Sequence, residues 1–263
     1  MIVSASYRTD IPAFFSAWFA ERWAAGFAEV ENPYNRKPYR VSLKPEEVDG
    51  IVFWTRAARP FFGCLDRVAE DGVPFFVHYT VTGYGAELEP GVPDWRKGAE
   101  TLHALADRFG KESVVWRYDP VLITETQTWD WHAEHFAELA AAIKGATDEA
   151  ALSFAQFYAK TRRGLAGQAA RDPDAAEKRT ALATFRDIAA GHGLALSLCA
   201  QPELLIEGVR DAACIDAARL SRIAGRPIAA AAKPHRPTCR CAQSRDIGTF
   251  ATCRFGCRYC YAA

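Results

Sequence analysis

Residues 1–26 read MIVSASYRTD IPAFFSAWFA ERWAAG, and this stretch predicts the repeating unit of the fold. Residues 2–6 are a short apolar run, typical of a buried strand. Asp10 can cap a helix, and Gly26 can end it. Between them, large apolar residues recur at helical spacing: Phe14, Phe15, Trp18, Phe19 and Trp23. The stretch therefore predicts a strand followed by an amphipathic helix.

The same alternation continues along the chain. Further strands are expected at residues 27–31, 50–54, 73–77, 113–118, 151–157 and 194–198, with an eighth near 246–250. Helices are expected before Gly72 and over 94–109, 128–143, 174–190 and 216–224. Alternating strands and helices form parallel sheets, and eight such units favour an α/β fold of the (β/α) TIM-like barrel type. An open doubly wound sheet is the alternative, although no glycine-rich phosphate turn follows the first strand.

Composition narrows the class of protein. The chain has 263 residues, of which 49% are hydrophobic and 24% are charged. This length and composition suit one domain over residues 1–263. The 32 basic and 32 acidic residues give a formal net charge of zero, so neither nucleic acid nor a membrane surface is an expected partner. The opening residues read as a strand rather than a signal sequence. We therefore expect a cytoplasmic protein that acts on a small-molecule substrate.

The cysteines gather at one end of the sequence. Five of the eight lie within residues 239–260, and the region 226–263 is rich in Ala, Pro, Arg and Cys. Without an export signal, clustered thiols favour metal binding over disulfides. The segment CRFGCRYC places Cys253, Cys257 and Cys260 at x3 and x2 spacing, with Tyr259 before the last. Three thiolates at this spacing can hold a 4Fe–4S cluster and leave one iron without a protein ligand.

Other metal chemistry is compatible with the same residues. Cys239-x-Cys241 lies just upstream and could complete a four-cysteine zinc site with the loop. The pair could also give the cluster a fourth ligand, bind a second metal, or remain free thiols. Cys199 and Cys214 are further thiols, each read as a buried apolar cysteine. A fourth thiolate on the cluster would favour an electron-transfer or structural protein over one that uses S-adenosylmethionine (SAM).

Polar residues follow almost every expected strand. In a barrel, the carboxyl ends of the strands carry the chemistry, and arginine there suits carboxylates and phosphates. We expect catalytic roles for five of these residues and cofactor contacts for three more. The catalytic set is Arg8, Asp10, His78, Arg117 and Asp119, and the cofactor set is Tyr7, Arg56 and Tyr259. Further polar groups follow the other strands: Asn32, Tyr34, Asn35, Gln156, Tyr158, Lys160, Gln201 and Glu203.

Each of these residues also has a structural interpretation. Arg8 with Asp10, or Arg117 with Asp119, could be an ion pair that braces the rim of the sheet. Asp10 is expected to cap the following helix in any case. His78 could be a buried, hydrogen-bonded strand residue.

The cysteine segment resembles the cluster loop of the radical SAM enzymes, in which an aromatic residue also precedes the third cysteine. That loop follows the first strand in those enzymes, whereas here it lies at residues 253–260. The chain as a whole resembles the bacterial domain-of-unknown-function 1848 family, noted for a C-terminal cysteine cluster similar to that of radical SAM proteins. The matching segments are SASYRTDIP (4–12), NPYN (32–35), FWTR (53–56), RYDP (117–120), CID (214–216), CRCAQSRDIG (239–248) and CYA (260–262).

The resemblance implies the cluster and the barrel but no substrate. A Gly-Gly-Glu segment, which binds the SAM amino group in radical SAM enzymes, is not found. Taken together, the sequence predicts a 4Fe–4S protein, radical-SAM-like in its chemistry, with SAM as a candidate cosubstrate and an electron-donor protein as a candidate partner. The alternatives are a non-SAM iron–sulfur protein, a zinc-stabilised barrel hydrolase, and a binding module without catalysis.

Overall fold

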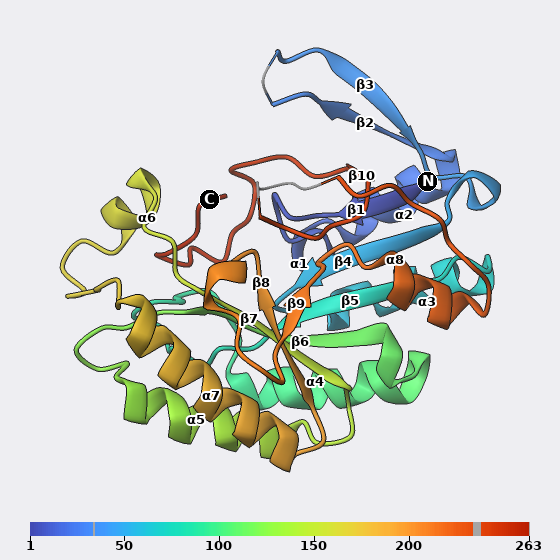
Figure 1. Cartoon of the computed structure of the whole chain (residues 1–263). Helices are drawn as coiled ribbons and strands as arrows, with labels where there is room; N and C mark the ends of the chain where they lie inside the picture. Colours follow the sequence, from blue (N-terminus) through green and yellow to red (C-terminus); the bar gives the residue numbers. More distant parts are fainter. Residues whose placement is uncertain (34, 234–237, 263) are drawn as a thin grey trace.

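A parallel β-sheet forms the centre of the protein in a computed structural model that describes residues 1–33, 35–233 and 238–262 (Figure 1). Eight strands pair in the order β10-β1-β4-β5-β6-β7-β8-β9, so that β10 and β9 are the two edges. Each pairing within this sheet is parallel. The chain therefore has an α/β fold with a central eight-stranded sheet, and its closure into a barrel stays a prediction.

The strands are short and the helices lie between them in sequence. The sheet comprises β1 (Ile2–Ala5), β4 (Gly50–Thr55), β5 (Phe75–Thr80), β6 (Val114–Val121), β7 (Glu149–Phe154), β8 (Ala195–Cys199), β9 (Arg210–Ala212) and β10 (Ser244–Asp246). The helices are α1 (Ile11–Phe14), α2 (Ser16–Ala25), α3 (Phe62–Glu70), α4 (Trp95–Phe109), α5 (Trp129–Ala142), α6 (Ala159–Gly164), α7 (Ala175–Gly191) and α8 (Ala217–Ala224). The expected alternation of strands and helices is confirmed.

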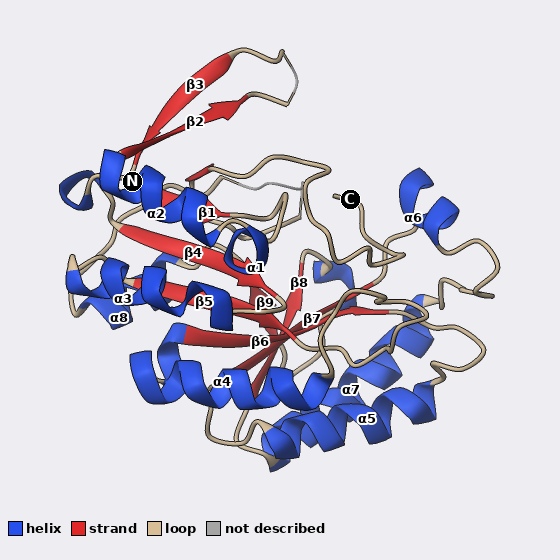
Figure 2. Ribbon diagram, turned by 180° about the vertical axis from the view of Figure 1, so that it is seen from behind, coloured by secondary structure: helices blue, strands red, loops and turns tan. Residues whose placement is uncertain are grey.

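The two faces of the sheet bury different residues because successive strand side chains point to opposite sides. On the outer face, Phe53, Val77 and Trp116 join the large core that packs against helices such as α4, α5 and α7 (Figure 2). On the inner face, the alternate positions Val52, Phe76 and Val115 join a smaller core with α8 and with residues that follow it. We name the described residues from 226 to 262 the C-terminal segment. The inner face is the one that also carries polar groups and thiols: Ser4, His78, Arg117, Ser153 and Cys199.

Helix starts agree closely with the sequence signals. Predicted cap residues accept hydrogen bonds from the first turns of their helices, as when the Asp10 side chain accepts from Ala13 N at 2.9 Å. Asp174 forms a reciprocal capping box with Glu177 at the start of α7. Side-chain caps also begin α4, α5 and α8: Asp94, Thr128 and Asp216. These short polar residues satisfy backbone N–H groups that have no partner inside the helix.

The expected second strand does not belong to the central sheet. Phe27–Glu31 (β2) pairs antiparallel with β3 (Pro38–Ser42), and this hairpin projects away from the sheet in Figure 1. Its burial alternates between half-buried or exposed and buried positions, unlike the fully buried β1. The sequence also gave no signal for the three-residue β9, or for the six-residue α6. Elements this short carry too few residues to display a period.

The C-terminal segment crosses the inner face before it reaches the sheet edge. Ala232 and Ala242 form an isolated antiparallel bridge, and residues 244–246 then add β10 beside β1. Residues 247–262 continue as turns and loops, beginning at Ile247, whose N–H donates to the Ser4 carbonyl at 3.0 Å. Among the described residues no helix is both long and apolar enough to cross a lipid bilayer.

Candidate functional site

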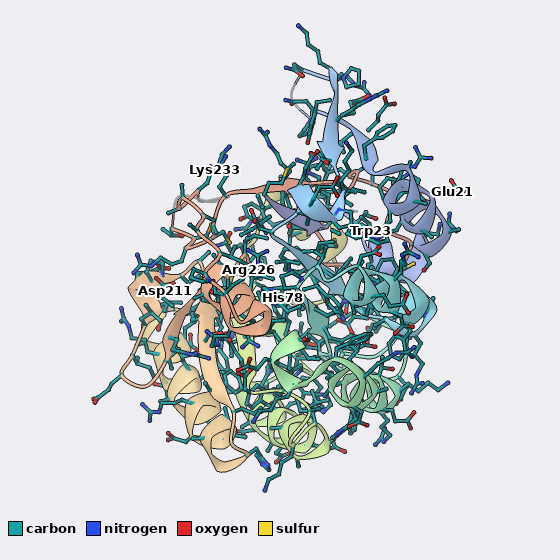
Figure 3. The ribbon with its side chains drawn as sticks, turned by 90° about the vertical axis from the view of Figure 1, so that its right-hand side faces the viewer. Glu21, Trp23, His78, Asp211, Arg226 and Lys233 are labelled. Atoms are coloured by element: carbon teal, nitrogen blue, oxygen red, sulfur yellow. The ribbon has the colours of Figure 1, made fainter. Side chains whose placement is uncertain are left out.

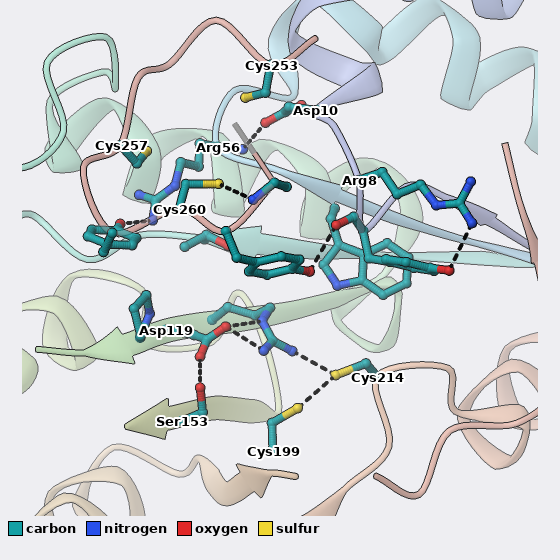
Figure 4. Close-up of a pocket in the computed structure, with 18 of the residues that line it drawn as sticks. Arg8, Asp10, Arg56, Asp119, Ser153, Cys199, Cys214, Cys253, Cys257 and Cys260 are labelled. Atoms are coloured by element: carbon teal, nitrogen blue, oxygen red, sulfur yellow. Dashed lines mark hydrogen bonds and ion pairs between the residues drawn. The ribbon is translucent and has the colours of Figure 1, made fainter. Parts of the chain in front are cut away.

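A cavity of about 300 Å³ opens at the carboxyl ends of the sheet strands (Figure 4). Its walls come from segments far apart in the sequence: the loop after β1, the ends of β4 to β8, and the C-terminal segment. Twelve of the thirteen residues that the sequence nominates line it: Tyr7, Arg8, Asp10, Arg56, Arg117, Asp119, Cys239, Cys241, Cys253, Cys257, Tyr259 and Cys260. The clustering of the polar groups is therefore confirmed, with His78 as the exception.

The segment 253–260, here named the cysteine loop, is fixed by backbone hydrogen bonds to the β5–α4 connection. Gly91 N donates to the Phe255 carbonyl at 3.0 Å, and Arg258 N donates to the Leu88 carbonyl at 2.9 Å. A Cβ at Gly91 would lie 2.8 Å from the Phe255 oxygen, so glycine permits this approach. The loop is thus docked through its main chain, which leaves its cysteine side chains available for the cavity.

Three half-buried thiols of the cysteine loop, Cys253, Cys257 and Cys260, face the cavity. Burial raises the pKa of Cys257 to about 12, and burial also raises the pKa of Cys253. Such thiols become thiolates only when a cation compensates for the lost hydration.

Among the described residues, no three or more His, Cys, Asp or Glu side chains are arranged as a site for a metal ion. The nearby sulfur donors are nonetheless of the kind that an iron–sulfur cluster takes, and its irons accept thiolates spread wider than those on one ion. The cysteine loop therefore presents the type of donor atom that a cluster takes.

Tyr259 belongs to a buried polar network on the same wall. Arg56 forms an ion pair with Glu89 at 2.8 Å and donates to the Tyr259 hydroxyl at 2.5 Å. Thr82 and Tyr259 both donate to the same Glu89 oxygen, Thr82 at 2.6 Å. Burial raises the pKa of Tyr259 well above its usual value, so the phenol keeps its proton. Sequence analysis missed Glu89, which follows a loop rather than a strand.

Asp10 and Arg8 do not form the ion pair that was considered. Asp10 accepts hydrogen bonds from Ala13 N and, at 2.8 Å, from Arg56 N, and burial raises its pKa to about 6. Arg8 instead lies 3.6 Å from Asp246, and its Nε atom is buried without a hydrogen-bond partner. Asp246 also accepts from Ser4 at 2.6 Å, and it was missed because β10 was expected two residues later.

Arg117 and Asp119 form the ion pair that was considered for the rim. The Arg117 guanidinium contacts the Asp119 carboxylate at 2.6 Å, and Ser153 donates to the other oxygen of that carboxylate. The same guanidinium donates to Cys214 Sγ at 3.2 Å. Both residues line the cavity, Arg117 buried and Asp119 half-buried, and the reduced dielectric there strengthens their electrostatic interaction.

His78 is a buried strand residue rather than a cavity residue, as its structural interpretation expected. Figure 3 labels it near the centre of the molecule. It is 3% exposed, stacks on Trp54, and its Nε2 lies 2.8 Å from the Cys214 carbonyl. Burial, followed by the nearby Arg117 charge, lowers its pKa well below the usual value, so the ring is neutral and Nε2 donates to that carbonyl. His78 therefore positions the segment that carries Cys214.

Other polar residues that follow the expected strands are divided between the site and the surface. Gln156 and Tyr158 line the cavity, whereas Lys160 is exposed on α6. Gln201 accepts from Phe154 N at 2.8 Å and so links β7 to the end of β8. Asn32 and Asn35 lie at the tip of the β2–β3 hairpin, because the strand expected before them is not in the sheet, and Tyr34 lies outside the described residues.

Comparisons with known proteins give a family without an activity. A family described as a domain of unknown function (DUF1848) matches residues 2–262. Curated proteins yield no match. Among solved structures, a "putative alpha-L-fucosidase" from Bacteroides thetaiotaomicron aligns over 81% of this chain and 92% of that chain, with 10% identity and a TM-score of 0.30. A similarity of that size carries no argument about fold or activity.

Proposed function

This chain belongs to the family described as a domain of unknown function (DUF1848), and from its site we propose that it is an iron–sulfur enzyme acting on a small molecule. Cys253, Cys257 and Cys260 would hold a 4Fe–4S cluster. A cluster of this kind supplies one-electron chemistry, and an iron without a protein ligand can bind a cosubstrate. SAM is the candidate cosubstrate, and radical-SAM-like chemistry is the proposed reaction class.

The observation that carries this proposal is the position of the three thiols. All three face the cavity whose other walls hold arginine, carboxylate and phenol groups from the strand ends. A zinc site that only stabilised the chain would need no such neighbours. The main-chain docking of the cysteine loop through Phe255 and Arg258 also holds the thiols at the cavity without using their sulfur atoms.

Arg8 is the residue best suited to bind an anionic group of the substrate or cosubstrate. All three arginines have a carboxylate partner: Arg56 pairs with Glu89 at 2.8 Å, Arg117 with Asp119 at 2.6 Å, and Arg8 with Asp246 at 3.6 Å. The Arg8 pair is the loosest of the three, its other guanidinium contacts are long at 3.4 Å, and its buried Nε makes no hydrogen bond. A buried N–H that lacks a partner gains free energy when a carboxylate or phosphate arrives.

The other polar groups would shape the cavity and help to exclude water from it. Tyr259, held by Arg56 and Glu89, belongs to a buried cluster against which Cys257 packs, and it would limit water on that wall. Solvent access and hydrogen bonding near the sulfurs tune the potential of a cluster. Asp10, which caps α1 beside Cys253, and Arg117 and Asp119, which belong to β6, are proposed to contact the substrate. Because the cluster needs a reductant, an electron-donor protein in the cytoplasm is the proposed partner.

Anaerobic purification followed by iron and sulfide analysis tests the cluster directly. We expect about four irons and four sulfides per chain for a cube. Low-temperature EPR of the reduced protein should show a signal that shifts when SAM is added, since new ligand atoms change the electronic environment of the iron. Arg8→Gln should weaken that shift or require more SAM, while iron content stays unchanged.

Three outcomes would contradict parts of this proposal. Zinc bound by the cysteine loop, or iron and labile sulfide in equal amounts that survive Cys257→Ala, would rule out the cluster and the function together. A cluster whose EPR spectrum does not change when SAM is added would indicate a non-SAM iron–sulfur protein. An unchanged SAM response in Arg8→Gln would remove only the proposed anion-binding role.

A further inference from the structure

Four cysteines that are separate from the cysteine loop lie on the inner side of the sheet, and three of them are in contact. Cys199 ends β8, Cys214 follows β9, and Cys239 and Cys241 belong to the C-terminal segment. All four line the cavity, and all belong to or pack on the inner core. Cys199 Sγ lies 3.1 Å from Cys214 Sγ, and Cys214 also interacts with the Cys241 side chain. We name these four residues the inner thiol group.

Backbone contacts on both sides hold the inner thiol group together. The Thr238 hydroxyl donates to the Ala200 carbonyl at 2.9 Å, beside Cys199. Ala242 N donates to the Ile215 carbonyl at 3.0 Å, beside Cys214. The residues that flank the Cys239–Cys241 pair are therefore tied to the residues that flank the other two thiols.

N–H groups are directed at the sulfur atoms. Arg117 donates to Cys214 Sγ at 3.2 Å, and Ile215 N donates to Cys241 Sγ at 3.5 Å. His78 fixes the backbone between them through the Cys214 carbonyl. A buried guanidinium and backbone N–H groups stabilise negative sulfur, which is the form that ligates metal. Apolar cysteines that only filled a core would not need a buried cation beside them.

We propose that the inner thiol group binds a second metal centre through four cysteine sulfurs. Only soft, thiophilic metals suit a donor set of this kind, either a zinc ion or iron. In tetrahedral zinc sites with Zn–S bonds of about 2.3 Å the sulfur atoms lie roughly 3.8 Å apart, so binding would widen the Cys199–Cys214 separation. Side-chain rotation is required, since the thiols now hydrogen-bond to one another rather than surround an ion.

The second centre would tie the end of the sheet to the C-terminal segment. Cys199 and Cys214 lie at the ends of β8 and β9, and Cys241 comes shortly before β10 at the opposite edge. In Figure 4, Cys199 and Cys214 lie across the cavity from the three cysteines of the cysteine loop. Four thiolates fill the coordination of a tetrahedral metal, so this centre would be structural and would not bind substrate.

The test uses a variant that lacks the cysteine loop ligands, so that it is independent of the proposed function. In the triple variant Cys253→Ala/Cys257→Ala/Cys260→Ala, elemental analysis should still find bound metal. X-ray absorption at the edge of that metal should report sulfur-only coordination. Adding Cys199→Ser and Cys214→Ser should remove the metal, whereas adding Cys64→Ala, a thiol in α3, should not. Zinc and iron are both measured, and either one in this site supports the proposal.

A milder pair of variants covers the case in which the double substitution prevents folding. Cys239→Ser and Cys241→Ser alone, in the triple variant, should each lower metal retention against a chelator. Failure to find metal in the triple variant would overturn the proposal. So would a disulfide between Cys199 and Cys214 in anaerobically purified protein, detected by mass spectrometry without reduction. Loss of the cluster chemistry at the cysteine loop would leave the proposal intact.

Discussion

The cysteine loop and the inner thiol group bring cysteine side chains together in two different ways. The cysteine loop brings three thiols together within eight consecutive residues, from Cys253 to Cys260. The inner thiol group collects its members from residues 199 to 241, and the sheet brings them together. A local set can be read from spacing, whereas an assembled set depends on strand order. The difference teaches that a cysteine between apolar neighbours in sequence can still belong to a polar cluster in space.

The largest expected effect separates the two sets by metal content. Cys257→Ala should remove most of the iron, because two remaining thiolates cannot hold a cluster that already has an iron without a protein ligand. Iron and sulfide analysis of anaerobically purified protein measures this. Cys64→Ala is the matched control, since Cys64 lies in α3 and donates to the Ser16 carbonyl. Equal iron loss in both variants would show that the cysteine loop has no special role.

Arg117 provides a change that should lower metal affinity at the inner thiol group and leave the iron of the cysteine loop in place. Arg117→Met removes the N–H donor to Cys214 Sγ, and loss of such a contact typically lowers metal affinity roughly 10–100-fold. Chelator competition in the variant without cysteine loop ligands measures that affinity. Arg222→Met is the control, because Arg222 pairs only loosely with Glu112 at 3.8 Å on the surface. Iron at the intact cysteine loop should not change in Arg117→Met.

Gly164 tests how closely the cysteine loop must dock. A Cβ at this position would lie 1.9 Å from the Arg258 carbonyl oxygen, which cannot be accommodated without moving the backbone. Gly164→Ala should therefore destabilise the protein by about 1–3 kcal/mol, the usual cost of overpacking, and lower iron retention. Urea unfolding gives the free energy. Gly63→Ala, with no atom near the added Cβ, should be neutral or stabilising.

The smallest expected effect is the contribution of His132, which lies behind the cysteine loop, to the loss of folding stability at low pH. His132 contacts Tyr84, whose ring also packs on Tyr259, and burial lowers its pKa to about 4 from 6.5. The Tyr118 hydroxyl lies 2.7 Å from its Nδ1 and the Leu122 carbonyl 3.0 Å from its Nε2, a pattern that suits the neutral ring.

Because the folded pKa lies below the unfolded value, the stabilisation is full above pH 6.5 and is lost as the pH falls towards 4. Between about pH 7 and pH 5.5, the unfolding free energy should fall by about 1 kcal/mol more in the wild type than in His132→Gln. Parallel slopes in wild type and His132→Gln would show that His132 does not contribute.

Much of the fold was readable because its signals are local. Caps such as Asp10 and Asp174 act on N–H groups two or three residues away, and apolar periods reflect the geometry of a single helix or strand. The polar residues at the strand ends could be predicted to gather, since parallel strands end at one edge of the sheet. The prediction that residues 27–31 join the central sheet was wrong, because alternation of apolar and polar residues does not say which sheet a strand joins.

The sequence by itself determined the cysteine loop, the helix starts and twelve of the residues that line the cavity, because each depends on near neighbours in the chain. Only the tertiary structure decided that Arg8 pairs with Asp246, that Glu89 holds Tyr259, and that Cys199 lies beside Cys214. The first two contacts join residues more than 160 positions apart, and the third crosses the loop that links β8 to β9. Their partners are chosen by strand order and by the path of the C-terminal segment, and no spacing in the sequence encodes those two features.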